Sequence, residues 1–493
     1  MSPGVIMEEQ QAPSAEPKPG PPKRRTLWIA IAVVVVIVVV LLAAVLGGLF
    51  AGAKPQAIFF VGYPGEGDKL VPTWWSNRAQ WPARWLYSEG LQDISFMGRL
   101  KTAGVDVTSI EGTAPTAPIS PDYNTSSGLF NTEYQAAFGR APKLYGPNSY
   151  DAMFTLALAF QKAQTTDTNS SAFKAALRAV ANPPGIAIRP GEWAKAAANI
   201  TNGIDIDYQG ASGAINYDQF GEVGSDYEAW SVNASAGINQ KLFIPEGSWS
   251  TSSVHSAVMK ANSLPVAPAA PPTNLPVGTL FDLTGPLKDF GPDQQNGTVL
   301  AATDINSAGG ITIGTTVYNI QLFHEDDGTD ATKAAAAATK LVTVDGVKAL
   351  IGGTASSASA AAFAVIAPAG IIEITSSSTS PVFTTADTTD QFWRTAPSDA
   401  LQGKAAGWYA FTQRGWRIMS VLYVDNAYGR GLSGVFAADF KARGGQILRL
   451  VPFPEDPAKV DANSILQTLF TPGSASYIPI ATWRTEEYGP TLR

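Results

Sequence analysis

The sequence predicts an α/β fold made of two lobes, each with a parallel sheet. From residue 277 onward, short apolar runs alternate with helical segments. This alternation indicates βαβ units, in which crossover helices join parallel strands and cover both faces of a sheet. The alternation pauses near Thr395–Gln402, which indicates a change from one sheet to the next. The length of 493 residues allows two or three domains.

The stretch Val347–Pro381 shows the pattern most clearly. An apolar strand ends at Gly352-Gly353, an Ala-rich helix starts near Ser356, and a second apolar strand ends in the hydroxyl-rich run Thr375–Thr379. Ligands of α/β sheets bind outside the carboxyl ends of the strands, and a helix N-terminus favours an anion such as a carboxylate. Taken alone, the stretch fits such a site and fits ligand-free tight loops equally well.

The remaining elements of the second segment follow the same alternation. Apolar runs mark the strands, and glycine pairs such as Gly309-Gly310 and Gly352-Gly353 mark some of the ends. The expected strands are Val277–Leu283, Val317–Phe323, Val347–Ile351, Ile371–Ile374, Ile418–Val424 and Gly445–Val451. The expected helices are Asp293–Ser307, Ala331–Val344, one from Leu401, and Gly431–Ala442.

The first segment begins abruptly in a strand. Strands are expected at Ala57–Val61 and Trp85–Tyr87, and helices at Asn148–Lys162 and Ala172–Val180. The rest is predicted to form short strands and turns. The segment has no opening strand of the Val277–Leu283 kind, so we interpret it as the second half of a fold.

The N-terminus predicts a membrane anchor. Residues 1–26 are polar, Pro-rich and expected to be disordered, and residues 27–51 are apolar and uncharged. A run of this length spans a bilayer core of about 30 Å. Lys23-Arg24-Arg25 before it predict a single-pass protein in the cell membrane whose later residues lie on the extracytoplasmic face. Cleavage after Ala51-Gly52-Ala53 is the alternative.

An Ala/Pro-rich linker at 262–276 divides the exported part. It separates a first segment, 56–250, from a second segment, 277–493.

Composition excludes several function classes. A net charge of −7 and a pI near 5.1 argue against nucleic-acid binding. With no cysteine and two histidines, thiolate chemistry and a Cys- or His-rich metal site are not expected. The acidic run Glu325-Asp326-Asp327 lacks the further ligands of a metal site. Ser212, in Gly-Ala-Ser-Gly, has no evident histidine partner, so we expect no enzyme and no cofactor.

Motifs in both segments resemble the branched-chain amino-acid-type solute-binding proteins of ABC importers, which have the type I periplasmic-binding fold. The second segment resembles the first half of that family, and the first segment resembles its second half. The matching runs of the second segment are Thr284-Gly285-Pro286, Ala302–Asn306 with Gly309-Gly310, Glu325–Asp327, Lys340–Val342, Ile351-Gly352 with Ser356, Ser378–Pro381, Phe392–Thr395 and Tyr428-Gly429. Those of the first segment are Val61–Tyr63, Ser88–Gly90, Tyr150–Ala152 and Tyr208–Gly213.

The order of the halves departs from the family. The half with Thr284-Gly285-Pro286 comes second here, and Tyr477–Trp483 resembles a second copy of Ala57–Tyr63. The chain is therefore either a circular permutant or a chimera of two domains. A permutant would close within one chain, whereas a chimera would pair its halves in a domain-swapped homo-oligomer.

The resemblance implies a set of ligand-binding residues. Ser356 and Thr379 match positions whose hydroxyl and N–H groups hold a ligand carboxylate. Ser377 matches a position whose carbonyl accepts from the ligand ammonium, and Glu89 matches the carboxylate that pairs with it. The matching pocket-wall positions are Tyr63, Tyr145, Phe290 and Tyr428.

The resemblance further implies a membrane-anchored solute-binding protein that captures an amino acid, branched-chain or similar, by hinge closure and docks on importer permease subunits. An amide, urea or a small carboxylic acid is an alternative ligand. A sensory ectodomain of the same fold is an alternative function, although residues 1–25 are too short for an output module. A non-functional permuted chain is the remaining alternative.

Overall fold

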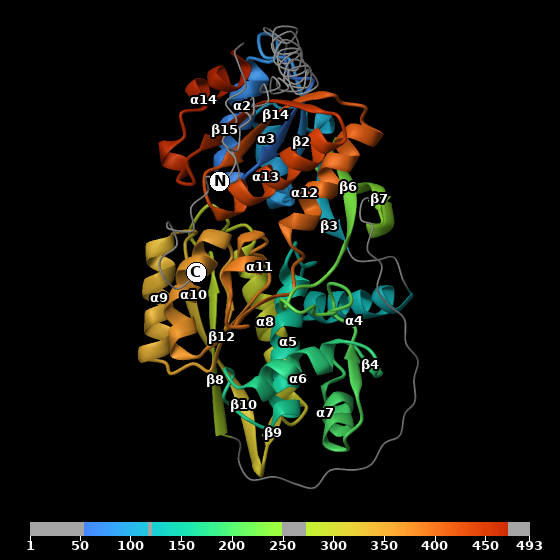
Figure 1. The fold of residues 1–493 in the computed structure, drawn as a ribbon, viewed down its shortest axis with the longest axis vertical. Coiled ribbons are helices and arrows are strands. Elements are labelled where there is room, and N and C mark those ends of the chain that lie inside the picture. The colour runs from blue at the N-terminus through green and yellow to red at the C-terminus, as the bar shows by residue number, and fades with distance from the viewer. Residues whose placement is uncertain (1–53, 117–120, 249–272, 472–493) are drawn as a thin grey trace, which may run out of the picture. The chain divides into compact units, whose positions relative to one another are not determined.

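The computed structural model describes residues 54–116, 121–248 and 273–471. They form two lobes, each built around one larger sheet (Figure 1). We define lobe 1 as residues 121–223 and 273–395, and lobe 2 as residues 54–116, 226–248 and 399–471. The predicted span 27–51 and the run Tyr477–Trp483 lie outside the described residues. Within those residues, no helix has the length and apolar character to cross a membrane.

Lobe 1 contains a six-stranded sheet in the order β13-β12-β11-β8-β10-β9. Neighbours run parallel except β9, which is antiparallel to β10. Its strands are β8 (Thr273–Phe281), β9 (Ile311–Ile313), β10 (Thr316–Asp326), β11 (Ala349–Gly352), β12 (Ile372–Thr375) and β13 (Phe392–Arg394). A separate parallel pair consists of β4 (Ile186–Ile188) and β5 (Ile206–Tyr208).

Helices cover both faces of the six-stranded sheet. In Figure 1, α9 and α10 lie on one side of it, and α5, α6 and α8 lie on the other. The helices from the first segment are α4 (Pro121–Phe138), α5 (Gly146–Ala163), α6 (Ser171–Ala181) and α7 (Trp193–Thr201). Those from the second are α8 (Gly291–Ser307), α9 (Ala331–Thr343), α10 (Ser356–Ile366) with η4 (Ala367–Ala369), and α11 (Val382–Ala386).

Lobe 2 contains a seven-stranded sheet to which both segments contribute, in the order β15-β14-β1-β2-β3-β6-β7. Strand β1 (Ala57–Val61) pairs in parallel with β14 (Ile418–Val424) and with β2 (Arg84–Tyr87). The others are β3 (Glu111–Thr116), β6 (Asp226–Val232), β7 (Ile238–Ile244) and β15 (Gln446–Phe453). The first segment therefore completes a sheet that the second segment begins, within one chain.

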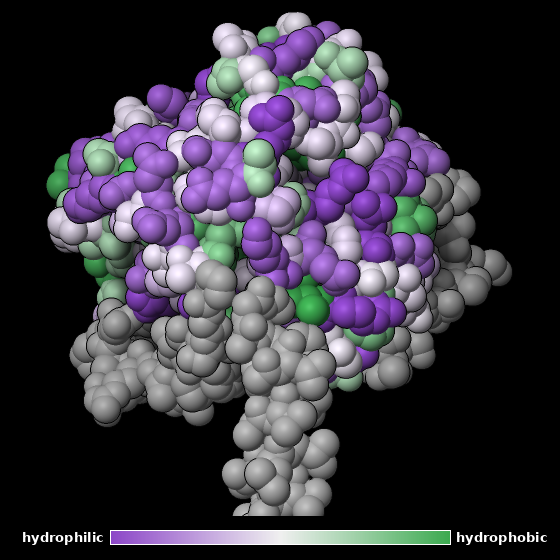
Figure 2. All heavy atoms as spheres, turned by 90° about the horizontal axis from the view of Figure 1, so that it is seen from above, coloured by the Kyte–Doolittle hydropathy of each residue, from purple (hydrophilic) through white to green (hydrophobic). Residues whose placement is uncertain are grey.

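The helices of lobe 2 pack on opposite faces of this sheet. Phe59 of β1 contacts Phe436 of α13, whereas Trp85 of β2 lies on the other face and contacts Trp74 of α2. The helices are α2 (Pro64–Ser76), α3 (Ile94–Thr102), α12 (Asp399–Trp408), α13 (Ala427–Ala442) and α14 (Ala462–Phe470). Shorter turns are η1 (Glu89–Leu91), η2 (Val107–Ser109), η3 (Glu246–Ser248), η5 (Tyr409–Gln413) and η6 (Pro457–Lys459). Figure 2 shows a mainly hydrophilic surface with scattered hydrophobic residues.

Three of the passages of the chain between the lobes follow β3, precede β6 and follow β13. Two of these crossings are joined by the antiparallel pairing of Thr116 with Asp226 and by a hydrogen bond of 2.9 Å from Ser225 Oγ to the Thr116 carbonyl. The third crossing, between Arg394 and Asp399, coincides with the predicted change of sheet near Thr395–Gln402.

Most predicted strands and helices are confirmed, but two expectations are wrong. The predicted linker 262–276 extends too far, because Thr273–Pro276 belong to β8 and pair with β10. The first segment is more helical than predicted, since α2, α3, α4 and α7 replace the expected turns. In α2, the residues Gly65, Gly67 and Pro72 hide the helical pattern; in α4, Ser, Thr and Asn do so.

Replacing Phe59 by alanine tests the contribution of β1. Its side chain is fully buried, and its ring centroid lies 4.3 Å from that of Phe436. Loss of this contact leaves a cavity between sheet and helix, so we expect the free energy of unfolding to fall by about 3–5 kcal/mol. Urea denaturation of the full-length protein measures it.

Phe220→Ala is the matched control, because that phenylalanine is 46% exposed. We expect a change within about 0.5 kcal/mol. Equal losses for the two variants would contradict a core position for β1.

Candidate functional site

Seven of the eight residues predicted to bind a ligand lie where strands end or helices begin. Tyr63 is the N-cap of α2 directly after β1, and Glu89 opens η1 directly after β2. In lobe 1, the corresponding positions follow β8, β11 and β12. They are Phe290 (N-cap of α8), Ser356 (start of α10) and Ser377 (after β12). Tyr145 is the N-cap of α5 in lobe 1, and Tyr428 lies in the first turn of α13 in lobe 2.

These seven residues surround one cavity between the lobes. The space outside protein atoms is about 330 Å³, part of which is open to solvent. The lining residues are Tyr63, Glu89, Gly90, Tyr145, Leu287, Phe290, Thr354, Ala355, Ser356, Ser377 and Tyr428.

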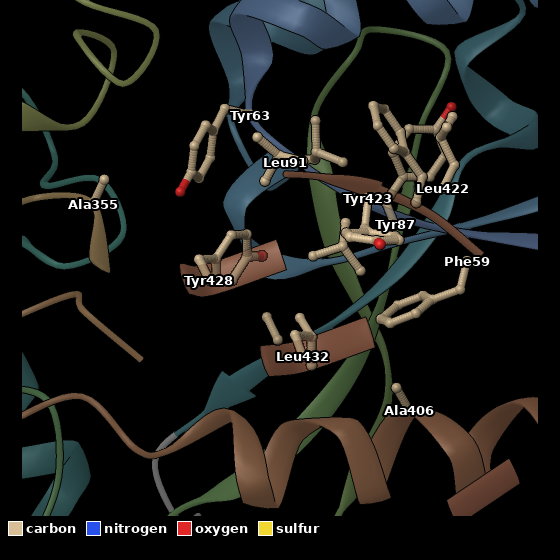
Figure 3. Packing of buried hydrophobic residues seen from close by; sticks show 14 of the residues in the cluster. Phe59, Tyr63, Tyr87, Leu91, Ala355, Ala406, Leu422, Tyr423, Tyr428 and Leu432 are labelled. Atoms are coloured by element: carbon tan, nitrogen blue, oxygen red, sulfur yellow. The ribbon is translucent and has the colours of Figure 1, made fainter. Parts of the chain in front are cut away.

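Aromatic rings form much of the wall. Tyr63 and Tyr428 stack with ring centroids 5.4 Å apart, and Tyr145 lies 6.4 Å from Phe290. In Figure 3, Tyr63 and Tyr428 lie at the edge of the buried cluster, and Ala355 lies across the space from them. Both tyrosine hydroxyls of the stacked pair are fixed, since Asn426 Nδ2 donates to Tyr63 and Tyr428 donates to Ser88 Oγ.

Glu89 is the one formally charged residue among the described residues that line the cavity. It is 2% exposed, and Gln402 Nε2 donates to its Oε2. Burial raises the pKa of Glu89, while the hydrogen bond from Gln402 opposes that rise. A cationic group that binds beside Glu89 would favour the ionised form of this carboxyl and pair with it.

The N-terminus of α10 forms the opposite side of the cavity. Its N-cap is Ala355, whose side chain offers no oxygen to the first-turn N–H groups. Ser356 Oγ accepts from the Ser380 N–H at 3.2 Å, so its own hydrogen is available to an acceptor. This end of the cavity can donate hydrogen bonds to an anion.

Ser377 and Thr354 complete that side. Ser377 Oγ donates to the Thr354 carbonyl at 2.8 Å and accepts from Gln294 Nε2 at 2.6 Å. None of the hydrogen bonds that we find among the described residues uses the carbonyl oxygen of Ser377. That carbonyl is the group predicted to accept from an ammonium.

Two buried aspartates position the loops that carry Thr354 and Leu287. Asp327 Oδ2 accepts from the Thr354 N–H at 2.9 Å, and Asp282 Oδ2 accepts from the Leu287 N–H at 2.7 Å. Thr354 Oγ1 also accepts from the Asp282 N–H at 2.8 Å. Both carboxylates accept from backbone groups, so they shape the wall without entering the cavity.

Thr379, the eighth predicted residue, lies behind the cavity. It is buried, and its hydroxyl donates to Asp399 Oδ2 at 2.9 Å. The structure therefore does not bring it together with the other seven, and a direct ligand contact stays a prediction. The cause is Asp399, which faces Thr379 from the start of α12.

Contacts across the rim hold the lobes together. Lys143 pairs with Asp93 at 2.7 Å and Arg99 pairs with Asp289 at 2.9 Å. Elsewhere on the rim, Ser357 Oγ donates to Glu455 Oε1 at 2.6 Å. Each contact joins one lobe to the other, so the arrangement is a closed one.

Sequence reasoning missed four lining residues. Leu287, Thr354 and Ala355 sit in loops whose course the sequence pattern does not specify. Gly90 had a detectable signal, because it follows Glu89 directly. A Cβ on Gly90 would come within 2.7 Å of the Gly62 carbonyl and 3.1 Å of the Tyr428 hydroxyl, so only glycine allows this approach.

Comparisons with known proteins agree with this geometry. Residues 274–469 match the family model described as periplasmic binding protein. An amino acid binding protein of Pseudomonas aeruginosa is 33% identical over 168 residues, which cover 34% of this chain and 44% of that protein. A leucine-, isoleucine-, valine-, threonine- and alanine-binding protein of the same organism is 31% identical over 175 residues, covering 36% and 42%.

A solved structure, the branched-chain amino acid transporter substrate binding protein LivJ of Streptococcus pneumoniae with isoleucine, is 29% identical. The match covers 37% of this chain and 50% of that one, with a TM-score of 0.33.

The resemblance predicted for the second segment is therefore confirmed over residues 274–469. The two-lobed α/β architecture is that of the periplasmic-binding fold, and the matching family model describes binding proteins. The chain spans less than half the length of the two curated relatives named above.

Replacing Asp327 by asparagine tests the electrostatics of the wall. Burial raises the pKa of Asp327 from 3.8 to about 7. A raised pKa means that the folded state holds the proton more tightly, so this group stabilises the fold fully below pH 4. That stability is lost as the pH rises through 7. Between pH 5 and pH 8 the wild type should lose about 2–3 kcal/mol relative to Asp327→Asn in urea denaturation.

Asp326→Asn is the matched control. Burial acts to raise the pKa of Asp326, but hydrogen bonds from Lys333, Thr284 and backbone groups outweigh it and lower the pKa to about 2. Because this carboxyl is ionised in both states above pH 5, the difference from wild type should not vary between pH 5 and pH 8. If the free energy of unfolding of Asp327→Asn also differed from that of wild type by the same amount at pH 5 and pH 8, the raised pKa of Asp327 would be contradicted.

Proposed function

We propose that this chain is a solute-binding protein that holds an amino acid, branched-chain or similar, between its two lobes. The observation that carries the proposal is the convergence of seven side chains, from both lobes and both segments, on one cavity with a single formal charge. The names of the curated relatives, which describe amino-acid-binding proteins, support it.

The charges of the cavity suit a zwitterion. Glu89 lies in lobe 2 as a partner for an ammonium group, and Ser377 offers a carbonyl from lobe 1. The N–H groups at the start of α10 and the Ser356 hydroxyl suit a carboxylate. Charge-assisted hydrogen bonds of this kind contribute about 1.5–3 kcal/mol each.

The walls suit an apolar ligand side chain. Tyr63, Tyr145, Phe290, Tyr428 and Leu287 present rings or methyl groups, and each is at most 7% exposed. A bound aliphatic group would lose its contact with water against these surfaces. Since the lining residues come from both lobes, a ligand stabilises the closed arrangement by touching both.

We further propose that the chain is a circular permutant that closes within one molecule. The central position of β1, between β14 of the second segment and β2 of the first, supports this over an obligatory exchange between chains. The proposal also includes an anchor at residues 27–51, a place on the extracytoplasmic face of the cell membrane, and docking on the permease subunits of an ABC importer.

Thermal unfolding of the full-length protein in detergent, followed by tryptophan fluorescence, tests the ligand class. A ligand at 100 times its dissociation constant stabilises by about 2.7 kcal/mol. We expect L-leucine, L-isoleucine or L-valine to raise Tm by a few degrees. Glu89→Gln should abolish the rise, because the ammonium group then lies against a buried neutral amide.

Glu133→Gln is the control, since Glu133 is a partly buried glutamate of α4 outside the cavity. It should keep the full ligand-induced rise. A rise that survives in Glu89→Gln would remove Glu89 from its assigned role. No rise with any amino acid in the wild type would contradict the ligand class.

A further inference from the structure

A second buried carboxylate stands behind the cavity. Asp399 is fully buried at the start of α12, and the structure ties it to lobe 1 by two hydrogen bonds. Its N–H donates to the Thr379 carbonyl at 2.8 Å, and its Oδ2 accepts from Thr379 Oγ1 at 2.9 Å. Its other oxygen, Oδ1, is buried without a hydrogen-bond partner among the described residues.

The same helix connects Asp399 to Glu89. Gln402 lies three residues further along α12, on the same face as Asp399, and its Nε2 donates to Glu89 Oε2. Asp399 is not one of the residues that line the cavity. It can therefore influence a ligand through Glu89 but does not touch it.

The surroundings offer little positive charge to this pair. Arg394 is the cation that acts on Asp399, and its Nη2 already binds Glu222 while Nη1 donates to the carbonyls of Ser378 and Ser380. The other ionisable groups that act on the pair are Tyr63, Tyr145 and Tyr428. Two neighbouring buried carboxylates with so little compensation do not both ionise readily.

We propose that Glu89 and Asp399 together retain one proton in the ligand-free protein, and that a ligand ammonium group displaces this proton. Asp399 is then a positioning residue that makes binding select for an amino group. The displacement of the proton by a ligand rests on the proposed function. The retention of the proton in the ligand-free protein does not.

The exchange balances in charge. Before binding, the pair carries one proton and one negative charge. After binding, Glu89 pairs with the ammonium group, both carboxyl groups are ionised, and the proton leaves to the buffer. Burial followed by the charge of Glu89 raises the pKa of Asp399 well above its usual range, which agrees with a proton retained at neutral pH. A ligand without an amino group has no means to displace it.

Infrared spectroscopy of the ligand-free, full-length protein at pH 7 tests the retained proton. The difference spectrum between wild type and Asp399→Asn should show the loss of one protonated carboxyl group. Glu66 and Glu373 are also fully buried with raised pKa values, but they are present in both proteins and cancel in the difference. A difference spectrum without such a loss would overturn the proposal.

Calorimetry with L-leucine tests the displacement. Titrations at pH 7 in buffers of different ionisation enthalpy should show release of about one proton by the wild type. Asp399→Asn should still bind but release close to none, and Asp205→Asn, a change at an exposed surface residue, should behave as wild type. Equal release from wild type and Asp399→Asn would overturn the proposal.

If Asp399→Asn does not fold, proton release by the wild type on binding L-leucine still tests the proposal. Release of no proton on L-leucine binding would overturn it directly. An absence of any binding heat would count against the proposed function, and the retained proton would then be judged from the infrared spectrum of Glu89→Gln. Loss of the protonated-carboxyl signal relative to wild type would support a proton shared by Glu89 and Asp399. A spectrum unchanged from wild type would overturn the shared proton.

Discussion

The structure depends on the pairing of β1 with β14. These strands belong to the two segments of the chain, and they lie side by side in the middle of the sheet of lobe 2. Without this pairing, β2 and β3 would be separated from β14 and β15, and the sheet would expose two unpaired edges. The pairing buries every residue of β1, so it joins the segments through backbone hydrogen bonds and through side-chain packing.

The cavity follows from that pairing. Because β1, β2 and β14 run parallel, their carboxyl ends meet at one edge and bring Tyr63, Glu89 and Tyr428 together. The strands of lobe 1 do the same for Phe290, Ser356 and Ser377. A cavity between the lobes therefore contains residues that lie hundreds of positions apart in the sequence.

The sequence allowed good prediction of the strands and of seven residues that line the cavity, for identifiable reasons. Ala57–Val61 and Ile418–Val424 are continuous apolar runs, and both strands have the predicted bounds. Glu89 was found through the motif after β2, which no periodicity would have shown. Asp399 was missed because its importance lies in its contacts with Thr379 and, through Gln402, with Glu89, and these form only when three separate stretches fold together.

The central claim is that one chain, with its halves in this order, forms one complete binding site. Native mass spectrometry of the full-length protein, released from detergent in the presence of L-leucine, tests it most directly. We expect monomers that each carry one bound leucine. Leucine found only on dimers, with monomers empty, would contradict it.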